Sequence, residues 1–207
     1  MKFIIGRKLN MTQIYADNGA AVPATAVAVR GNVVTQIRTK DADGYEAIQV
    51  GEGVRNANRI AKPQKGQWKD MGSFAAVKEF RTVPSTLNPV PFKVGDKVEL
   101  SQFKAGDAVE VSAISKGKGF QGVVKRHGFH GGPRSHGQKH SEREPGSIGG
   151  GLRNKVPTGM RMAGRMGSNR VTVRGLKVVH VDPEENVLYV SGAIPGRRGT
   201  LVEIVAR

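Results

Sequence analysis

Short runs in which apolar and polar residues alternate occupy the chain on both sides of its middle. In residues 26–30 valine alternates with alanine and arginine, and after a Gly-Asn turn Val33, Thr35 and Ile37 fall on one side of a second run. A period of two is the pattern of a half-buried β-strand, because successive side chains of a strand point to opposite faces. The beginning of the chain therefore predicts short strands joined by tight turns.

The same alternation returns later in the chain. Val109, Val111 and Ala113 share one face of a further predicted strand. Other predicted strands cover residues 47–50, 171–173, 176–181, 187–190 and 201–205. Short strands at close spacing, broken by glycine, favour an antiparallel barrel or sandwich over alternating strand-helix-strand units. The sequence thus predicts a mainly β domain built from both ends of the chain, over residues 1–115 and 168–207.

Residues 51–95 interrupt this pattern with polar, proline-punctuated sequence. We interpret them as a small peripheral insertion on the barrel, with one short helix predicted over residues 73–80. Trp68, the single tryptophan, is expected to cover the barrel and not to stack on a nucleic-acid base.

A second interruption, residues 116–167, is long, glycine-rich and basic. Counted from Lys116 to Arg170, it holds twelve Lys and Arg residues, two acidic residues, fourteen of the 28 glycines and four of the five histidines. Loops longer than about 12–15 residues are uncommon within compact domains and are usually functional or disordered. The segment is also too poor in large apolar residues to form a core of its own.

Composition indicates what such a segment binds. The chain carries a net charge of +16 and a pI near 10.5, which favours a polyanionic partner. Nucleic acid is the main expectation, and an anionic membrane surface is the lesser one. There is no apolar run of about 18 residues, no secretion signal and no cysteine, so we expect an intracellular protein without disulfides or thiolate metal sites.

We therefore predict that the segment becomes ordered on RNA, and a merely solvated tail is the alternative. Phosphates would supply the stabilisation that a hydrophobic core supplies elsewhere. Glycine lets the backbone approach phosphates closely, while Arg and His can contact phosphates or stack on unpaired bases. Met160, Met162 and Met166 are expected to act as small apolar anchors at the end of the segment.

Three sharper chemistries are weaker alternatives. Residues 117–122, GKGFQG, match the dinucleotide-binding G-x-G-x-x-G, but Gly128 and the glycines after it would end the required helix within two turns. His127, His130, His136 and His140 could suggest a metal, but they lie among repelling cations without thiolate ligands. Ser135, His136 and Glu142 could form a hydrolytic triad only on a rigid scaffold, for which the sequence gives no sign. We expect no enzyme activity, cofactor or metal.

Several motifs in order along the chain resemble one family. These are IIGRKLNMTQIY, DGYEAIQVG, ISKGKGFQGVVKRHGFHGGPRSHG, EREPGSIGG, RMAGRMGSNRVTV and GAIPGRRG. They are similar to the bacterial-type L-three family of large-subunit ribosomal proteins, and the resemblance is weakest over residues 52–100. It implies a translation-protein-type β-barrel and an internal extension that threads through ribosomal RNA toward the peptidyl transferase centre. The extension would begin at residues 117–126 and have residues 146–152 near its tip.

The resemblance also implies a structural role in the large subunit, a part in early assembly, and neighbouring ribosomal proteins as partners. Neither a membrane nor a second copy of the chain is expected as a partner. The protein would lie in cytoplasmic ribosomes or in those of an organelle, and a free-standing nucleic-acid chaperone or translation factor is the alternative. The residues expected to bind ribosomal RNA are Lys116, Gly117, Lys118, Gly119, Lys125, Arg126, His127, Arg134, His136, Lys139, His140, Arg143, Gly149, Gly150, Arg153, Lys155, Arg161, Arg165 and Arg170.

One position departs from the family pattern. Many bacterial members carry a side-chain-methylated glutamine after GSIG, and this chain has Gly150 there. That modification is therefore not available to this protein, and contacts near the tip are expected to differ in detail.

Overall fold

The computed structural model describes residues 1–15, 19–68, 71–81, 92–149 and 155–206. The chain divides into two compact units. The first, here called the barrel unit, comprises Met1–Ile114 and Arg170–Arg207, and the second, the extension unit, comprises Ser115–Asn169. Both ends of the chain thus contribute to one unit, and the second is inserted between them.

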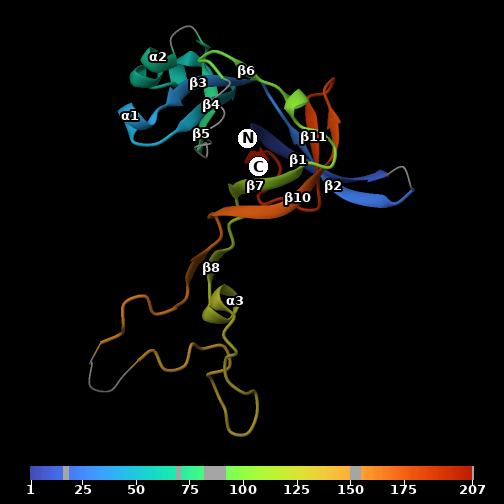
Figure 1. Cartoon of the computed structure of the whole chain (residues 1–207). Helices are drawn as coiled ribbons and strands as arrows, with labels where there is room; N and C mark the ends of the chain where they lie inside the picture. The colour runs from blue at the N-terminus through green and yellow to red at the C-terminus, as the bar shows by residue number, and fades with distance from the viewer. Residues whose placement is uncertain (16–18, 69–70, 82–91, 150–154, 207) are drawn as a thin grey trace. The chain divides into compact units, whose positions relative to one another are not determined.

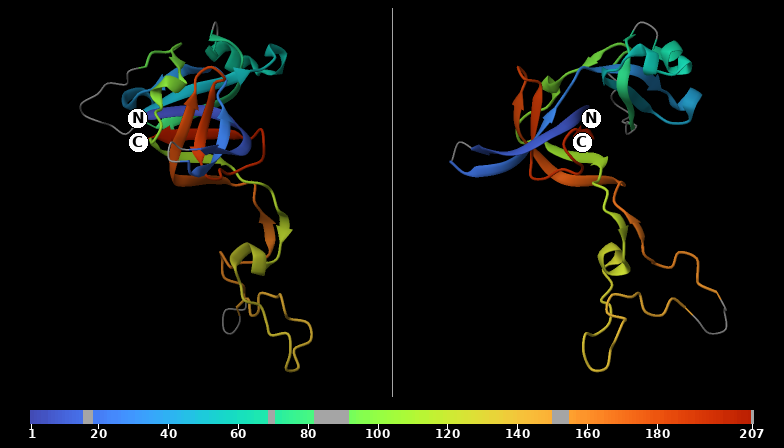
Figure 2. Two further views of the ribbon diagram at one scale, coloured as in Figure 1. Left: turned by 90° about the vertical axis from the view of Figure 1, so that its right-hand side faces the viewer. Right: turned by 180° about the vertical axis from the view of Figure 1, so that it is seen from behind.

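Six of the described strands close into an antiparallel barrel in the order β1-β12-β7-β10-β11-β2 (Figure 1). They are β1 (Lys2–Tyr15), β2 (Ala21–Ala28), β7 (Ala108–Ile114), β10 (Arg170–Asp182), β11 (Val187–Ser191) and β12 (Leu201–Ala206). The two other views show the far ends of β1 and β2 continuing past the barrel as a hairpin (Figure 2). The predicted mainly β fold with an antiparallel barrel is confirmed.

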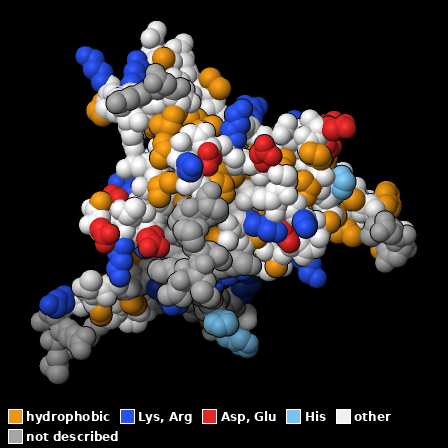
Figure 3. All heavy atoms as spheres, turned by 45° about the horizontal axis from the view of Figure 1, so that its top comes forward, with side chains coloured by type: hydrophobic (Ala, Val, Ile, Leu, Met, Phe, Trp, Pro, Cys, Tyr) orange, Lys and Arg blue, Asp and Glu red, His pale blue; other side chains and the backbone are white. Residues whose placement is uncertain are grey.

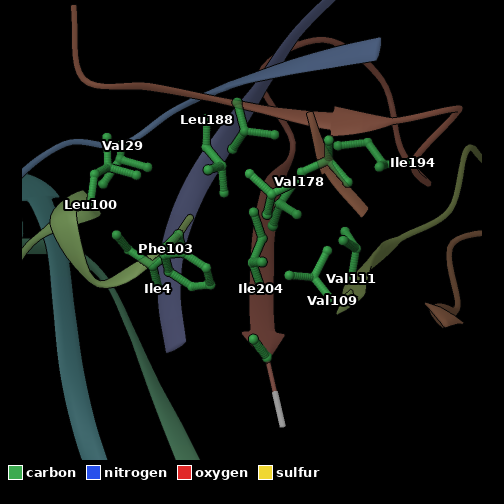
Figure 4. Packing of buried hydrophobic residues seen from close by; sticks show 14 of the residues in the cluster. Ile4, Val29, Leu100, Phe103, Val109, Val111, Val178, Leu188, Ile194 and Ile204 are labelled. Atoms are coloured by element: carbon green, nitrogen blue, oxygen red, sulfur yellow. The ribbon is translucent and has the colours of Figure 1, made fainter. Parts of the chain in front are cut away.

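Alternating side chains fill the barrel interior (Figure 4). Val109, Val111 and Ala113 of β7 are all buried, as their spacing predicts, and Val202 and Ile204 of β12 are completely buried beside them. Each fully buried aliphatic side chain contributes roughly 1.5–3 kcal/mol relative to its exposed state. The barrel therefore has a continuous apolar core of its own.

A second sheet lies within the barrel unit, with strand order β5-β4-β3-β6. Its strands are β3 (Asn32–Arg38), β4 (Ala47–Val54), β5 (Phe74–Arg81) and β6 (Lys97–Val98). The strands predicted over residues 33–37 and 47–50 are present, but they build this sheet and not the barrel. Alternation predicts a strand without specifying its partner, because pairing depends on contacts distant in sequence.

The helix predicted over residues 73–80 is wrong, since the structure has strand β5 there. Phe74 and Phe80 are both buried, but in separate apolar clusters: Phe74 packs with Ile60 and Trp68, and Phe80 packs with Phe3, Ile5 and Ile48. The Phe74 ring also occupies the space beside Gly51, where a Cβ would lie 2.4 Å from Phe74 Cγ. Packing in the sheet thus overrides the helical preference of the alanines.

The helical segments of the barrel unit are short. They are α1 (Lys40–Asp43), α2 (Lys62–Trp68) and the 3-10 turns Ala57–Arg59 and Leu100–Gln102. Trp68, at the end of α2, packs edge-on against Phe74 with 5.4 Å between ring centroids. It thus covers the four-stranded sheet and not the barrel, which corrects the expected location. Throughout the described part of the chain, every helix is too short or too polar to cross a bilayer.

Apolar and polar contacts join the sheet to β1. The Phe3 and Phe80 rings stack with 4.8 Å between centroids. The side chain of Asn32 accepts from the Ile5 N–H at 2.9 Å and donates to the Ile5 carbonyl at 2.9 Å. Because an unpaired buried peptide group is costly, this amide replaces a neighbouring strand at that point of β1.

Charges of both signs are intermixed on the barrel unit. Asp and Glu side chains lie among Lys and Arg on the face shown in Figure 3. Ion pairs in this unit include Lys2–Asp107, Arg7–Glu52, Arg38–Asp43, Lys78–Glu203, Arg170–Glu203 and Arg174–Glu110. Much of the positive charge of this unit is therefore balanced locally.

Acidification is expected to weaken the contacts of Glu79 on the outer strand of the sheet. A hydrogen bond from the Tyr45 hydroxyl, at 2.8 Å, is the main cause that holds the pKa of Glu79 below the ordinary value of 4.5. A lowered folded-state pKa means that this stabilisation is fully present above pH 4.5 and is lost as the pH falls through the lowered value.

Replacing Tyr45 by phenylalanine should therefore destabilise the unit at neutral pH and reduce its loss of stability on acidification. Urea unfolding followed by Trp68 fluorescence, on both sides of pH 4.5, tests this. Parallel decreases in stability on acidification in the Tyr45→Phe and parent proteins would contradict it.

Candidate nucleic-acid interface

The extension unit begins and ends in a narrow neck of paired backbone. The Ser115 N–H donates to the Asn169 carbonyl at 2.9 Å and the Lys118 N–H to the Met166 carbonyl at 3.0 Å. Strands β8 (Gly119–Gln121) and β9 (Gly164–Met166) then pair antiparallel. Among the predicted site residues, the exposed Lys116, Lys118 and Arg165 lie on this neck.

Glycine is required at the neck for close packing of backbone. Gly167 has φ 79°, and a Cβ there would lie 2.2 Å from the Lys116 carbonyl oxygen. Gly119 also has positive φ, at 67°. Composition predicts phosphate contact as the role of the glycines in this segment, and at Gly167 the structure shows a steric reason instead.

The dinucleotide-binding alternative is wrong for GKGFQG. Part of this motif lies on β8, whose partner is antiparallel, and the helix that follows, α3 (Val123–His127), has only five residues. Gly128 ends it with a left-handed φ of 75°, which is the usual glycine-dependent helix stop. A dinucleotide fold needs a full helix and a second parallel strand.

Helix α3 is held to the returning chain through one carbonyl. The Arg126 Nη1 donates to the Met162 oxygen at 2.7 Å, and His127 Nε2 lies 3.1 Å from the same oxygen. Val123, the first residue of the helix, is buried. Met160 and Met166 are half-buried, whereas Met162 is exposed and holds the helix through its backbone carbonyl.

Beyond α3 the chain follows an irregular looped path (Figure 1). Residues 132–142 form a loop closed at its base, where the Gly132 N–H donates to the Glu142 carbonyl at 3.1 Å. The Arg134 guanidinium forms an ion pair with the Glu142 carboxylate across the same base. Glu142 is therefore committed to Arg134, and the triad alternative with Ser135 and His136 gains no support.

Uncompensated positive charge distinguishes the extension unit from the barrel unit. Arg134–Glu142 is the one ion pair between described residues of Ser115–Asn169. The exposed cations of this unit without an acidic partner in the described structure are Lys116, Lys118, Lys125, Lys139, Arg143, Lys155, Arg161 and Arg165. Cations left without counter-charges on a glycine-rich path create a strongly positive local potential that attracts polyanions.

The four histidines of the unit do not gather. His130, His136 and His140 are exposed, and His127 is occupied with the Met162 carbonyl. Among the described residues, no three His, Asp or Glu side chains are grouped so that they could hold a metal ion.

The remaining predicted site residues have different locations. Gly149 and Lys155 are exposed in the extension unit, whereas Gly150 and Arg153 lie outside the described residues. Arg170 belongs to the barrel unit, where it pairs with Glu203.

Two features of the structure involve residues that are not among the predicted site residues. Phe129 packs beside His127, with 6.1 Å between ring centroids. The Lys8 Nζ donates to the Ile194 and Gly196 carbonyls at 2.6 and 3.1 Å and thereby fixes a turn that carries two exposed arginines, Arg197 and Arg198. The GAIPGRRG motif was the available signal for this turn, while nothing in the sequence marks Lys8 as its support.

Comparison with known proteins identifies the family. Residues 92–193 match the family model described as Ribosomal protein L3. The chain is 47% identical over 203 residues to the large ribosomal subunit protein uL3 of Herpetosiphon aurantiacus, covering 97% of this chain and 94% of that protein. It is 45% identical over 208 residues to the uL3 of Chloroherpeton thalassium, covering 99% of each. The chain therefore belongs to the ribosomal protein L3 family, whose members are structural proteins of the ribosome and not enzymes.

Proposed function

We propose that this protein is a structural component of the large ribosomal subunit that binds large-subunit ribosomal RNA mainly through its extension unit. The observation that carries the proposal is the set of eight exposed cations without acidic partners among the described residues of Ser115–Asn169. RNA phosphates are the counter-charges that such a surface fits.

The geometry of the unit supports RNA as the polyanion. A membrane-binding segment needs an apolar face, whereas the exposed apolar side chains here, Phe120, Ile148, Val156 and Met162, are scattered among ten described Lys and Arg residues along an irregular backbone. Irregular RNA offers crevices and unpaired bases that a looped, glycine-rich segment can enter. The barrel unit, which has its own core, would hold the two ends of the extension together.

Three finer roles belong to the same proposal and rest on the family resemblance. The extension reaches toward the peptidyl transferase centre, the protein supports early assembly of the subunit, and neighbouring ribosomal proteins contact the barrel. The predicted contact residues are those given above from the sequence, of which Arg134 and Arg170 already have acidic partners, Glu142 and Glu203.

The salt dependence of RNA binding should become weaker when cations of the extension unit are removed. In a variant with Lys116, Lys118, Lys125, Lys139 and Arg165 all replaced by glutamine, the slope of log K against log salt should become shallower by about 0.7–0.9 for each phosphate that is no longer neutralised. Fluorescence anisotropy with a fragment of large-subunit ribosomal RNA, over a series of salt concentrations, measures this slope.

The matched control removes the same charge from the barrel unit. Lys40, Lys62, Lys65, Lys97 and Lys104 are exposed there, and their replacement by glutamine should change the slope much less. Equal changes of slope in the two variants would show that net charge alone drives binding and would overturn the assignment to the extension.

A high-salt wash distinguishes this function from that of a free-standing nucleic-acid chaperone or translation factor. A ribosomal component should stay with the large subunit through a high-salt wash and sediment with it. A factor held by exposed phosphate contacts should be released, because such contacts weaken steeply with salt.

A further inference from the structure

A hollow of about 620 Å³ lies within the extension unit, where three stretches of chain meet. It lies between residues 127–132, residues 138–146 and Arg161. Its volume falls in the range of about 300–1,000 Å³ that is usual for pockets binding small organic molecules. The lining side chains that can contact a ligand include those of His127, Phe129, Gln138, Glu144 and Arg161.

One wall of the hollow is aromatic and held in position. His127 and Phe129 form a tilted pair, with ring centroids 6.1 Å apart and an angle of 47° between planes. The His127 ring lies against the Met162 carbonyl at 3.1 Å, and Arg126 donates to the same carbonyl. Because both ends of this contact belong to the extension unit, the wall does not depend on the barrel for its support.

Another part of the lining is backbone packed too closely for side chains. A Cβ on Gly131 would lie 2.1 Å from the Glu142 carbonyl oxygen, and one on Gly132 would lie 2.8 Å from the Ser141 carbonyl oxygen. The Gly132 N–H hydrogen bond to Glu142 closes this part of the lining. The hollow is therefore formed by the fold of the unit before any ligand enters.

The lining combines three kinds of group that suit one class of ligand. Phe129 offers a ring face for stacking, Gln138 offers an amide that can both donate and accept, and Arg161 offers a positive charge. Proteins that recognise unpaired RNA bases use this combination of aromatic stacking, edge hydrogen bonds and phosphate neutralisation. A simple anion would gain nothing from the aromatic wall and would be repelled by Glu144.

We propose that this hollow receives a single unpaired nucleotide of an RNA strand, with its base stacked on Phe129. The proposal rests on the proposed function, since it assigns one nucleotide-binding pocket within the RNA-binding unit. Arg161 neutralises the phosphate, while Gln138 and Glu144 meet the base edge. A carboxylate accepts from an exocyclic amine, so the pocket favours adenine, cytosine or guanine over uracil.

The test uses the full-length protein and a short single-stranded RNA of uridines with one central 2-aminopurine, an adenine analogue whose fluorescence is quenched by stacking. We expect quenching on binding, and tighter binding than to an all-uridine strand. Phe129→Ala should abolish the quenching and weaken binding by about 5- to 150-fold, which corresponds to the usual 1–3 kcal/mol for stacking one base. The salt slope should not change, because no charge is removed.

Two controls separate stacking from folding. Phe120, on β8, is 76% exposed and lies outside the hollow, so Phe120→Ala should bind and quench as the parent does. Phe129→Leu keeps an apolar side chain but removes the ring, and should lose quenching while the Gly132 amide stays protected from hydrogen exchange.

The outcomes distinguish this proposal from the proposed function. RNA binding with a steep salt slope, but without quenching and without an effect of Phe129→Leu, would overturn the pocket and leave the RNA-binding role intact. Absence of any salt-dependent RNA binding by the parent protein would overturn both.

Discussion

Replacing Arg7 by methionine is expected to lower the free energy of unfolding of the barrel unit by about 3–5 kcal/mol, the usual result of breaking a buried ion pair from one side. Arg7 on β1 binds Glu52 on β4 through two contacts, Nε to Oε1 and Nη2 to Oε2, each 3.2 Å long. The Glu52 side chain is completely buried, whereas Arg7 remains 30% exposed. Without Arg7, a carboxylate would stay buried with its principal counter-charge gone.

Replacing Glu52, the other partner of the ion pair, should have a smaller effect. Glu52→Gln leaves a guanidinium that is partly in contact with solvent, and its cost should therefore be below that of Arg7→Met. The double variant Arg7→Met with Glu52→Leu removes both charges and should recover much of the stability, as apolar replacements of buried pairs often do.

Urea unfolding followed by Trp68 fluorescence measures these differences, since the single tryptophan packs on the sheet that carries Glu52. The exposed pair Lys2–Asp107, with side chains 38% and 25% exposed, is the control: Lys2→Met should cost no more than about 1 kcal/mol. Equal losses of unfolding free energy in Arg7→Met and Lys2→Met would show that the Arg7–Glu52 pair stabilises the unit no more than an exposed pair does.

Substituting alanine for Gly167 is expected to open the neck of the extension unit. The new Cβ would lie 2.2 Å from the Lys116 carbonyl oxygen and 3.0 Å from the Lys118 nitrogen, so backbone must move to accept it. The positive φ adds about 1–2 kcal/mol of strain for a residue with a Cβ. We expect loss of hydrogen-exchange protection at the Ser115 and Lys118 amides, whose acceptors lie across the neck, and weaker RNA binding.

Gly159 provides the matched control for this substitution. Its φ is 83°, close to the 79° of Gly167, but no atom lies within 4 Å of the position of its Cβ. Gly159→Ala thus carries the same backbone strain without the collision, and protection at the neck should remain. Unchanged protection in Gly167→Ala would show that the neck is not closed in solution as it is in the structure.

Both effects depend on contacts that the sequence does not reveal. Arg7 and Glu52 are 45 residues apart and lie on strands of different sheets, and no local pattern pairs them. Alternation, which is local, predicted the first part of the Glu52 strand, over residues 47–50, but not the strand that carries Arg7. The pairing of the two residues depends on long-range packing. The helix expected over residues 73–80 was wrong for the same reason, since Phe74 is buried by Trp68 and Phe80 by Phe3, contacts that no local pattern reveals.

At the candidate site too, some features can be predicted from the sequence and others depend on the folded chain. Its position, charge and glycine content are readable directly from the residues, because a segment poor in large apolar residues cannot form a core of its own. The helix stop at Gly128 was also predictable. The closed base at Gly132 and Glu142, and the hollow beside Phe129, were not, because both depend on residues brought together by irregular turns.

By itself, the sequence determined that this protein is mainly β, that a basic segment interrupts the fold, and which family it resembles. These properties follow from periodicity, composition and motifs, which are local in the chain. The tertiary structure alone decided which strands close the barrel, which build the second sheet, and which cations keep no acidic partner among the described residues. Those properties depend on distances between residues far apart in sequence, and only the packed chain sets those distances.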